Sequence, residues 1–202
     1  MKYSCSKKVG CVLAVAIFAG LVGADDGRAN LLENGSFETG DFSGWEVFTT
    51  ENGTVGQVGF PNIMEFDTNG NGKATKSVRF QVGQDQFRTA GDTRQGGGLY
   101  THFTGKAGIL EISVDVACTF TSDTKRRNLD GGLFELLLDG ETLNRFHIGP
   151  IHKGTTKRGT LRASSPITAG VHQIRIRITR PFASMAAPFQ YVDNVVVLQK
   201  PD

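Results

Sequence analysis

The two ends of the chain carry the sequence pattern that decides the fold. The stretch NLLENGSFE at residues 30–38 leads into a glycine-containing segment that ends at Trp45, and the stretch YVDNVVV occupies residues 191–197. Each stretch contains an acidic residue, Glu38 near the beginning of the chain and Asp193 near its end. We expect these stretches to form the first and last strands of a β-sandwich and to lie side by side, which would bring the two carboxylates together.

Strand patterns fill the region between these two stretches, and helical periodicity is nearly absent. Apolar residues occupy every second position from Ile112 to Phe120, with polar or small residues between them, and residues 171–180 repeat the pattern. This alternation predicts strands with one buried and one solvated face. Asp139 and Gly140 form a tight-turn pair between two further apolar runs, and the 26 glycines of the chain supply other bends.

Short strands joined by turns are typical of an all-β sandwich or barrel with antiparallel pairing. We expect strands near residues 30–38, 44–49, 54–59, 77–83, 98–104, 108–120, 132–139, 142–148, 157–163, 171–180 and 190–199. We find neither an internal repeat nor a composition change that would separate a second domain, so residues 25–202 are interpreted as one domain.

Residues 1–24 have the pattern of a secretory signal peptide. Three lysines precede an apolar run from Val9 to Val22, and Val22-Gly23-Ala24 fits the small-residue rule for cleavage. The alternative is a retained anchor, but the apolar run is short for a membrane span and acidic residues follow at once. We therefore expect a secreted or extracytoplasmic protein, in the periplasm or at the cell surface, with no membrane span after cleavage.

Removal of the signal changes the charge and the cysteine content. The signal contains three of the 22 Lys and Arg residues and none of the 20 Asp and Glu residues, which leaves 19 basic and 20 acidic side chains. Such a balance gives no reason to expect a nucleic-acid partner. Cys118 remains as the single cysteine, and its place in an alternating strand indicates a buried apolar position rather than a reactive thiol.

The two terminal stretches resemble the jelly-roll carbohydrate-binding modules and their galactose-binding-like relatives. In that family an Asn-Gly-x-Phe-Glu motif opens the domain, and a Tyr-x-Asp strand closes it. The resemblance implies a jelly-roll β-sandwich of two antiparallel sheets, with a structural calcium ion between the first and last strands. Its ligands would be the side chains of Glu38 and Asp193 and the backbone carbonyl of Ser36, with Glu65 or Asp67 as a further acid. The alternative is that the two carboxylates only make hydrogen bonds that join the terminal strands.

Residues 67–72, DTNGNG, match the first half of an EF-hand loop, with oxygen-bearing side chains at positions one, three and five and glycine at position six. The twelfth position, which should be a bidentate glutamate, is Val78. We therefore favour an Asn- and Gly-rich turn over a second calcium site.

Four residues are candidates for sugar binding. Tyr100 and His102 occupy alternate positions of one expected strand, and Arg175 and Arg177 do so on another. Sugar sites combine aromatic faces with planar polar side chains, and these residues supply both. Trp45 is not included, because the resemblance implies that this tryptophan packs inside the domain.

The alternative for the two arginines is an ordinary solvated sheet face with ion pairs between strands. Glu111 and Asp115 are the acidic residues that we expect beside Arg175 and Arg177.

The leading hypothesis is a secreted, non-catalytic binding module that recognises a carbohydrate or glycoconjugate. A structural or adhesive surface protein without a sugar site is the alternative. An enzyme is the third hypothesis, and no catalytic motif in the sequence supports it.

Overall fold

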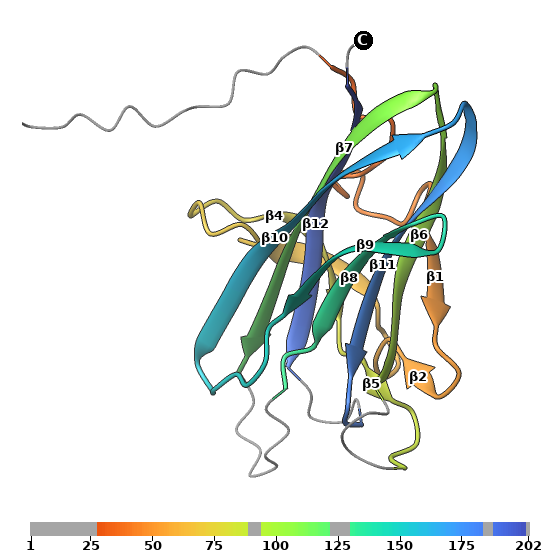
Figure 1. Ribbon diagram of the computed structural model, residues 1–202. Coiled ribbons are helices and arrows are strands. Elements are labelled where there is room, and N and C mark those ends of the chain that lie inside the picture. Colours follow the sequence, from red (N-terminus) through yellow and green to blue (C-terminus); the bar gives the residue numbers. More distant parts are fainter. Residues whose placement is uncertain (1–27, 89–93, 122–129, 184–187, 201–202) are drawn as a thin grey trace, which may run out of the picture.

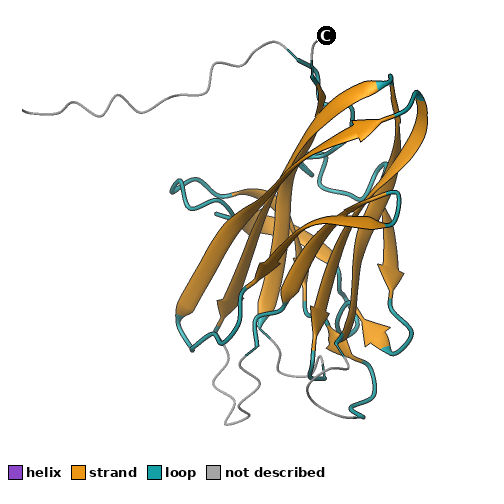
Figure 2. Cartoon of the chain, viewed as in Figure 1, coloured by secondary structure: helices purple, strands orange, loops and turns teal. Residues whose placement is uncertain are grey.

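The computed structural model describes residues 28–88, 94–121, 130–183 and 188–200. The predicted signal peptide lies outside the described residues. Strands, turns and loops make up the described ranges, and no helix occurs in them (Figure 2). Within these ranges there is accordingly no helix of the length and hydropathy needed to cross a membrane.

Ten strands form two five-stranded antiparallel sheets that face each other (Figure 1). The β6 sheet has the order β1 (Glu46–Thr49), β6 (Gln95–Gly105), β11 (Gly170–Arg180), β8 (Leu133–Leu138) and β9 (Glu141–His147). The β12 sheet has the order β10 (Thr155–Ile167), β7 (Gly108–Phe120), β12 (Phe189–Gln199), β4 (Thr75–Phe80) and β3 (Asn62–Phe66). A short ribbon pairs β2 (Gly53–Thr54) with β5 (Gly83–Gln84).

The strand order is that of a jelly roll. From β6 onward the chain passes back and forth between the sheets, so that β7, β10 and β12 lie in one sheet and β8, β9 and β11 lie in the other. The orders β4-β12-β7-β10 and β6-β11-β8-β9 are the two four-stranded layers of this fold, and β3 and β1 extend them at one edge. The predicted sandwich of two antiparallel sheets is confirmed.

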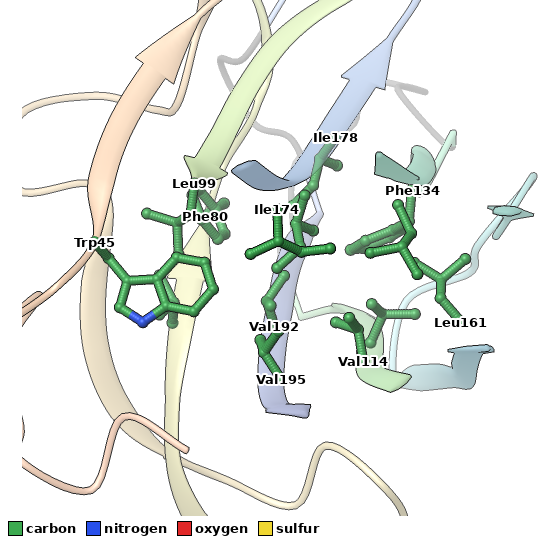
Figure 3. Packing of buried hydrophobic residues seen from close by; sticks show 14 of the residues in the cluster. Trp45, Phe80, Leu99, Val114, Phe134, Leu161, Ile174, Ile178, Val192 and Val195 are labelled. Atoms are coloured by element: carbon green, nitrogen blue, oxygen red, sulfur yellow. The ribbon is translucent and has the colours of Figure 1, made fainter. Parts of the chain in front are cut away.

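Alternation along the strands fills the space between the sheets. Leu99, Ile174 and Ile178 from the β6 sheet face Val114 and Val192 from the β12 sheet, and all five are buried (Figure 3). This packing removes apolar surface from water, which is the main favourable term in folding.

Two sequence predictions about single residues of the core are confirmed. Trp45 belongs to the core, with 6% of its surface exposed. Cys118 is fully buried, and desolvation raises the pKa of its thiol to about 12, so it is an unreactive apolar side chain.

The stretch at residues 30–38 is a series of turns, so the prediction of a first strand there was wrong. Asn34 and Phe37 have φ values of 51° and 56°, which a strand does not contain. The stretch nevertheless lies against β12, because the amide of Leu31 donates to the carbonyl of Val197 at 2.9 Å. The carbonyl of Gly35 accepts from the amide of Val195 at 2.8 Å. The two ends of the domain are therefore side by side, as expected.

Two other regions differ from the sequence prediction. The strand expected near residues 54–59 is reduced to β2, because the chain turns at Gly56 and Gly59, where φ is positive. Strand β3 was not predicted, and it pairs with β4 as a hairpin across residues 67–74.

Candidate functional site

The four residues predicted for sugar binding lie on one surface, the outer face of the β6 sheet. Because Ile174, Ile176 and Ile178 point into the core, the residues between them on β11 point outward. Tyr100 of β6 pairs directly with Arg175 of β11, and His102 and Arg177 occupy the neighbouring outward positions.

An arginine and two aromatic rings form the centre of this face. The guanidinium of Arg175 lies over the rings of Phe48 and Tyr100, at 4.6 and 5.4 Å from their centroids. His102 meets the Tyr100 ring edge-on, with 5.7 Å between the ring centroids. The hydroxyl of Tyr100 donates a hydrogen bond to Glu46 on β1, and this bond raises the pKa of Tyr100. The face thus presents a group of planar side chains held in fixed positions.

A buried carboxylate fixes two further arginines on the same face. Glu135 of β8 accepts hydrogen bonds from Nε of Arg177 at 2.7 Å and from Nε of Arg145 at 3.0 Å. The expected partners of the arginines were wrong, because Glu111 and Asp115 lie on β7 in the other sheet. Alternation gives the face to which a residue belongs, but it does not say which strand becomes its neighbour.

One end of the face is hollowed. The hollow has a volume of about 460 Å³, and its lining includes Thr50, Arg94, Gln95, Glu135, Arg177 and Thr179. Next to the hollow, Gly98 of β6 lies in register between Phe48 of β1 and Arg177 of β11. Because glycine has no side chain, Gly98 places none between these two residues. A Cβ atom at Gly98 would lie 1.9 Å from the carbonyl oxygen of Ile176, so only glycine fits there.

A hollow of about 500 Å³ lies on the outer face of the β12 sheet, between β7, β10 and β12. Its lining contains no aromatic side chain. The β6 sheet combines an arginine over two rings, arginines fixed by Glu135 and an adjoining hollow, and this combination favours it as the candidate site.

The residues expected to hold calcium lie where the beginning of the chain meets β4 and β12. The carboxylate of Asp193 is buried and accepts a hydrogen bond from the hydroxyl of Thr75 at 2.7 Å. Glu38 accepts from the amide of Lys76 at 3.0 Å, and its backbone carbonyl accepts from the Lys76 ammonium at 2.9 Å. Burial, reinforced by neighbouring acids, raises the pKa of Asp193 to about 6. Ser36 lies in the exposed turn that precedes Glu38.

The further acid expected at this place does not join it. Within the described ranges, no three Asp, Glu, His or Cys side chains lie together as a metal site would require. The carboxylate of Asp67 accepts instead from the amides of Gly70 and Gly72, at 2.8 and 3.2 Å, and lies 3.6 Å from Arg158. Glu65 is exposed on the β3–β4 hairpin. Residues 67–72 thus form the turn that we favoured over an EF-hand loop.

Three residues of the face were missed in the sequence. Phe48 lies in an expected strand, and its spacing from Glu46 could have placed the two on one face. Glu135 is an acid within an apolar strand, a pattern that signals a charged partner. Arg94 lies in a loop and carried no periodic signal.

No protein-family model matches the chain, and no curated protein matches it. Solved structures with a similar fold include the enzymatically active domain of tailspike protein 4 from bacteriophage CBA120. The two chains are 14% identical with a TM-score of 0.47, and the match covers 85% of this chain and 21% of the tailspike chain. A Clostridium thermocellum chain of endo-1,4-beta-D-xylanase 10B with its CBM22-1 module has 15% identity and a TM-score of 0.45, covering 85% and 29%.

The CBM22-1 xylan-binding domain of Paenibacillus barcinonensis Xyn10C has 14% identity and a TM-score of 0.43, with 87% of this chain and 97% of that domain covered. The chain spans only 21% to 29% of the length of the first solved chains that it matches. These solved structures thus include carbohydrate-binding modules as well as longer chains with enzymatic domains.

Proposed function

We propose that the outer face of the β6 sheet binds a carbohydrate, and that the protein is a non-catalytic binding module that acts outside the cytoplasm. The observation that carries this proposal is the group formed by Phe48, Tyr100 and Arg175 next to a polar hollow. Small-ligand sites combine aromatic surface with a few well-placed polar groups, and this face offers both.

The polar groups of the face are held in place before any ligand arrives. Glu135 fixes Arg177 and Arg145, and the amide of Gln173 lies 3.2 Å from Nε2 of His102. Groups that are already ordered lose little conformational entropy on binding, which favours affinity for a polar ligand.

The arrangement of the carboxylates supports binding rather than catalysis. Glycoside hydrolysis needs one carboxyl group that donates a proton and a second that acts as base or nucleophile. Glu135 is engaged by two arginines, and Glu46 is engaged by the Tyr100 hydroxyl. Both carboxylates therefore have a structural role in the face.

The proposal is tested by measuring binding of the purified protein to a panel of neutral and acidic polysaccharides, by affinity electrophoresis and titration calorimetry. We expect at least one polysaccharide to bind, and Tyr100→Ala to weaken binding about ten-fold through loss of the ring. Phe60→Ala is the matched control, because Phe60 is a half-buried ring under an arginine on the other sheet. Failure to bind any polysaccharide would overturn the proposal and favour the structural or adhesive alternative.

We also infer that Glu38 and Asp193 hold a structural calcium ion. The residues fit this ion in the kind of donor, since two carboxylates and the Thr75 hydroxyl are oxygen ligands, and Asp193 has no ion pair among the described residues. Calcium takes six to eight oxygens, so backbone carbonyls, including that of Ser36, and water would complete the set.

A further inference from the structure

The guanidinium of Arg175 has no hydrogen-bond partner among the described residues. Its Nε atom is buried without one, and its contacts are the rings of Phe48 and Tyr100. The buried N–H of an arginine side chain is costly when it is left unpaired.

Arg79 on the other sheet shows what a paired arginine looks like in the same setting. Its guanidinium also lies over two rings, at 5.1 Å from the centroids of Phe60 and of Phe189. Unlike Arg175, it donates from Nε to the side-chain oxygen of Asn62 at 3.1 Å. Contact with two rings therefore does not prevent an arginine from being paired, so this contact does not explain why Arg175 has no hydrogen-bond partner.

A second unpaired arginine nitrogen belongs to a residue that lines the hollow on the same face. Arg94 donates from Nη2 to Asp130 at 3.2 Å, but its Nη1 atom is buried without a partner. Arg177 lines the same hollow, two residues from Arg175 along β11. Three guanidinium groups thus extend from the aromatic centre of the face to its hollow end.

Three of the acidic residues around these arginines are already engaged. Glu135 binds Arg145 and Arg177, Asp130 binds Arg94, and Glu46 binds the hydroxyl of Tyr100. Glu51 also lines the hollow and is exposed. No carboxylate within the described ranges forms an ion pair with Arg175.

We infer that this face selects polysaccharides that carry oxyanions, either uronate carboxylates or sulfate esters, with Arg175 as the principal contact and Arg94 as a second one. The inference rests on the proposed function, since it names the class of sugar bound at the same site. The fork of N–H groups on arginine matches the geometry of a carboxylate or a sulfate, and contact with two rings holds the guanidinium of Arg175 in place in advance.

Matched pairs of polysaccharides test the inference. One pair is polygalacturonate and its methyl ester, and the other is a sulfated galactan and agarose, with affinity measured by titration calorimetry. We expect the charged member of one pair to bind about ten-fold tighter or more, and its affinity to fall as NaCl is raised. The pair that shows the preference distinguishes carboxylate from sulfate.

Two variants test whether Arg175 causes the preference for the charged polysaccharide. Arg175→Gln should abolish the preference for the charged member, and Arg79→Gln should preserve it. Equal affinity for both members of both pairs would overturn the inference and leave the proposed function intact. No binding to any of the four would also overturn the inference, and the wider panel of polysaccharides would then decide the proposed function. The salt dependence of the unmodified protein gives an answer even if Arg175→Gln fails to fold, since salt-independent binding also contradicts the inference.

Discussion

At the scale of single residues, the imidazole of His172 is held at both of its nitrogens. Nδ1 lies 2.6 Å from the carboxylate of Asp139, and Nε2 lies 2.9 Å from the carbonyl oxygen of Thr168. Since neither partner can donate, both ring nitrogens must carry a proton for both bonds to form. The bond to Asp139, followed by the bond to Thr168, raises the pKa of His172.

This arrangement predicts a pH-dependent contribution to stability. Because the pKa of His172 is higher in the folded state, the contribution is complete below the unfolded pKa of about 6.5 and is lost as the pH rises through the folded value. The free energy of unfolding of His172→Gln should therefore lie furthest below that of the unmodified protein near pH ~5.5 and approach it near pH ~9. Urea denaturation at several pH values measures this gap. The control is His102→Gln, which replaces an exposed histidine, and a gap independent of pH would contradict the assignment.

The residues of the candidate site show which information a single sequence contains. Strand alternation places Tyr100, His102, Arg175 and Arg177 on outward positions, and all four lie on one face. The face also depends on Glu135, which is brought to Arg177 by the pairing of β8 with β11. Strand order follows from packing of the whole chain, so the sequence pattern could not identify this partner.

At the scale of elements, strand β12 contains a bulge. Its register on β7 passes from Asp193 opposite Asp115 to Val196 opposite Ser113, so one extra residue is accommodated. Asn194 takes the left-handed conformation there, with φ at 48°, and its side-chain amide donates to the carboxylate of Asp115 at 3.1 Å.

The bulge predicts a difference between two substitutions of Asn194. Both Asn194→Gly and Asn194→Val remove the hydrogen bond to Asp115, but only valine is β-branched and resists a positive φ. We expect Asn194→Val to be about 1–2 kcal/mol less stable than Asn194→Gly, as measured by urea unfolding. Equal free energies of unfolding would show that the left-handed conformation at residue 194 imposes no cost on a β-branched side chain.

Long alternating elements are predictable, and turn-rich ones are less so. The strands expected at residues 108–120 and 171–180 agree with β7 and β11 within one residue at each end. Residues 30–38 were expected to form the first strand as the counterpart of the closing one, but Gly35 and two residues with positive φ place turns there. At Gly35 a Cβ atom would lie 2.2 Å from the carbonyl oxygen of Val195, so this glycine is required by tertiary contact with β12.

At the scale of the whole molecule, the beginning of the domain is fastened to its end by side chains as well as backbone. Asn30 donates from its amide to the carbonyl of Val195 at 2.9 Å and accepts from the amide of Val197 at the same distance. Glu38 and Asp193 lie on these two segments and are held by the adjacent residues Thr75 and Lys76 of β4. A cation between the carboxylates would therefore crosslink three segments that are distant in sequence.

Such a crosslink predicts that calcium raises the melting temperature of the protein. A ligand at one hundred times its Kd stabilises the folded state by about 2.7 kcal/mol, which corresponds to roughly 5–10 °C for a domain of this size. We expect scanning calorimetry to show a melting temperature lower by about this amount in chelator than in calcium, and Glu38→Gln and Asp193→Asn to abolish the difference. In chelator, Asp193→Asn should melt no lower than the unmodified protein, because it removes a buried charge while its side-chain oxygen can still accept from Thr75. Glu65→Gln is the control and should keep the full response, since Glu65 is exposed on the β3–β4 hairpin. An unmodified protein that melts at the same temperature in chelator and in calcium would show that hydrogen bonds alone join the two ends.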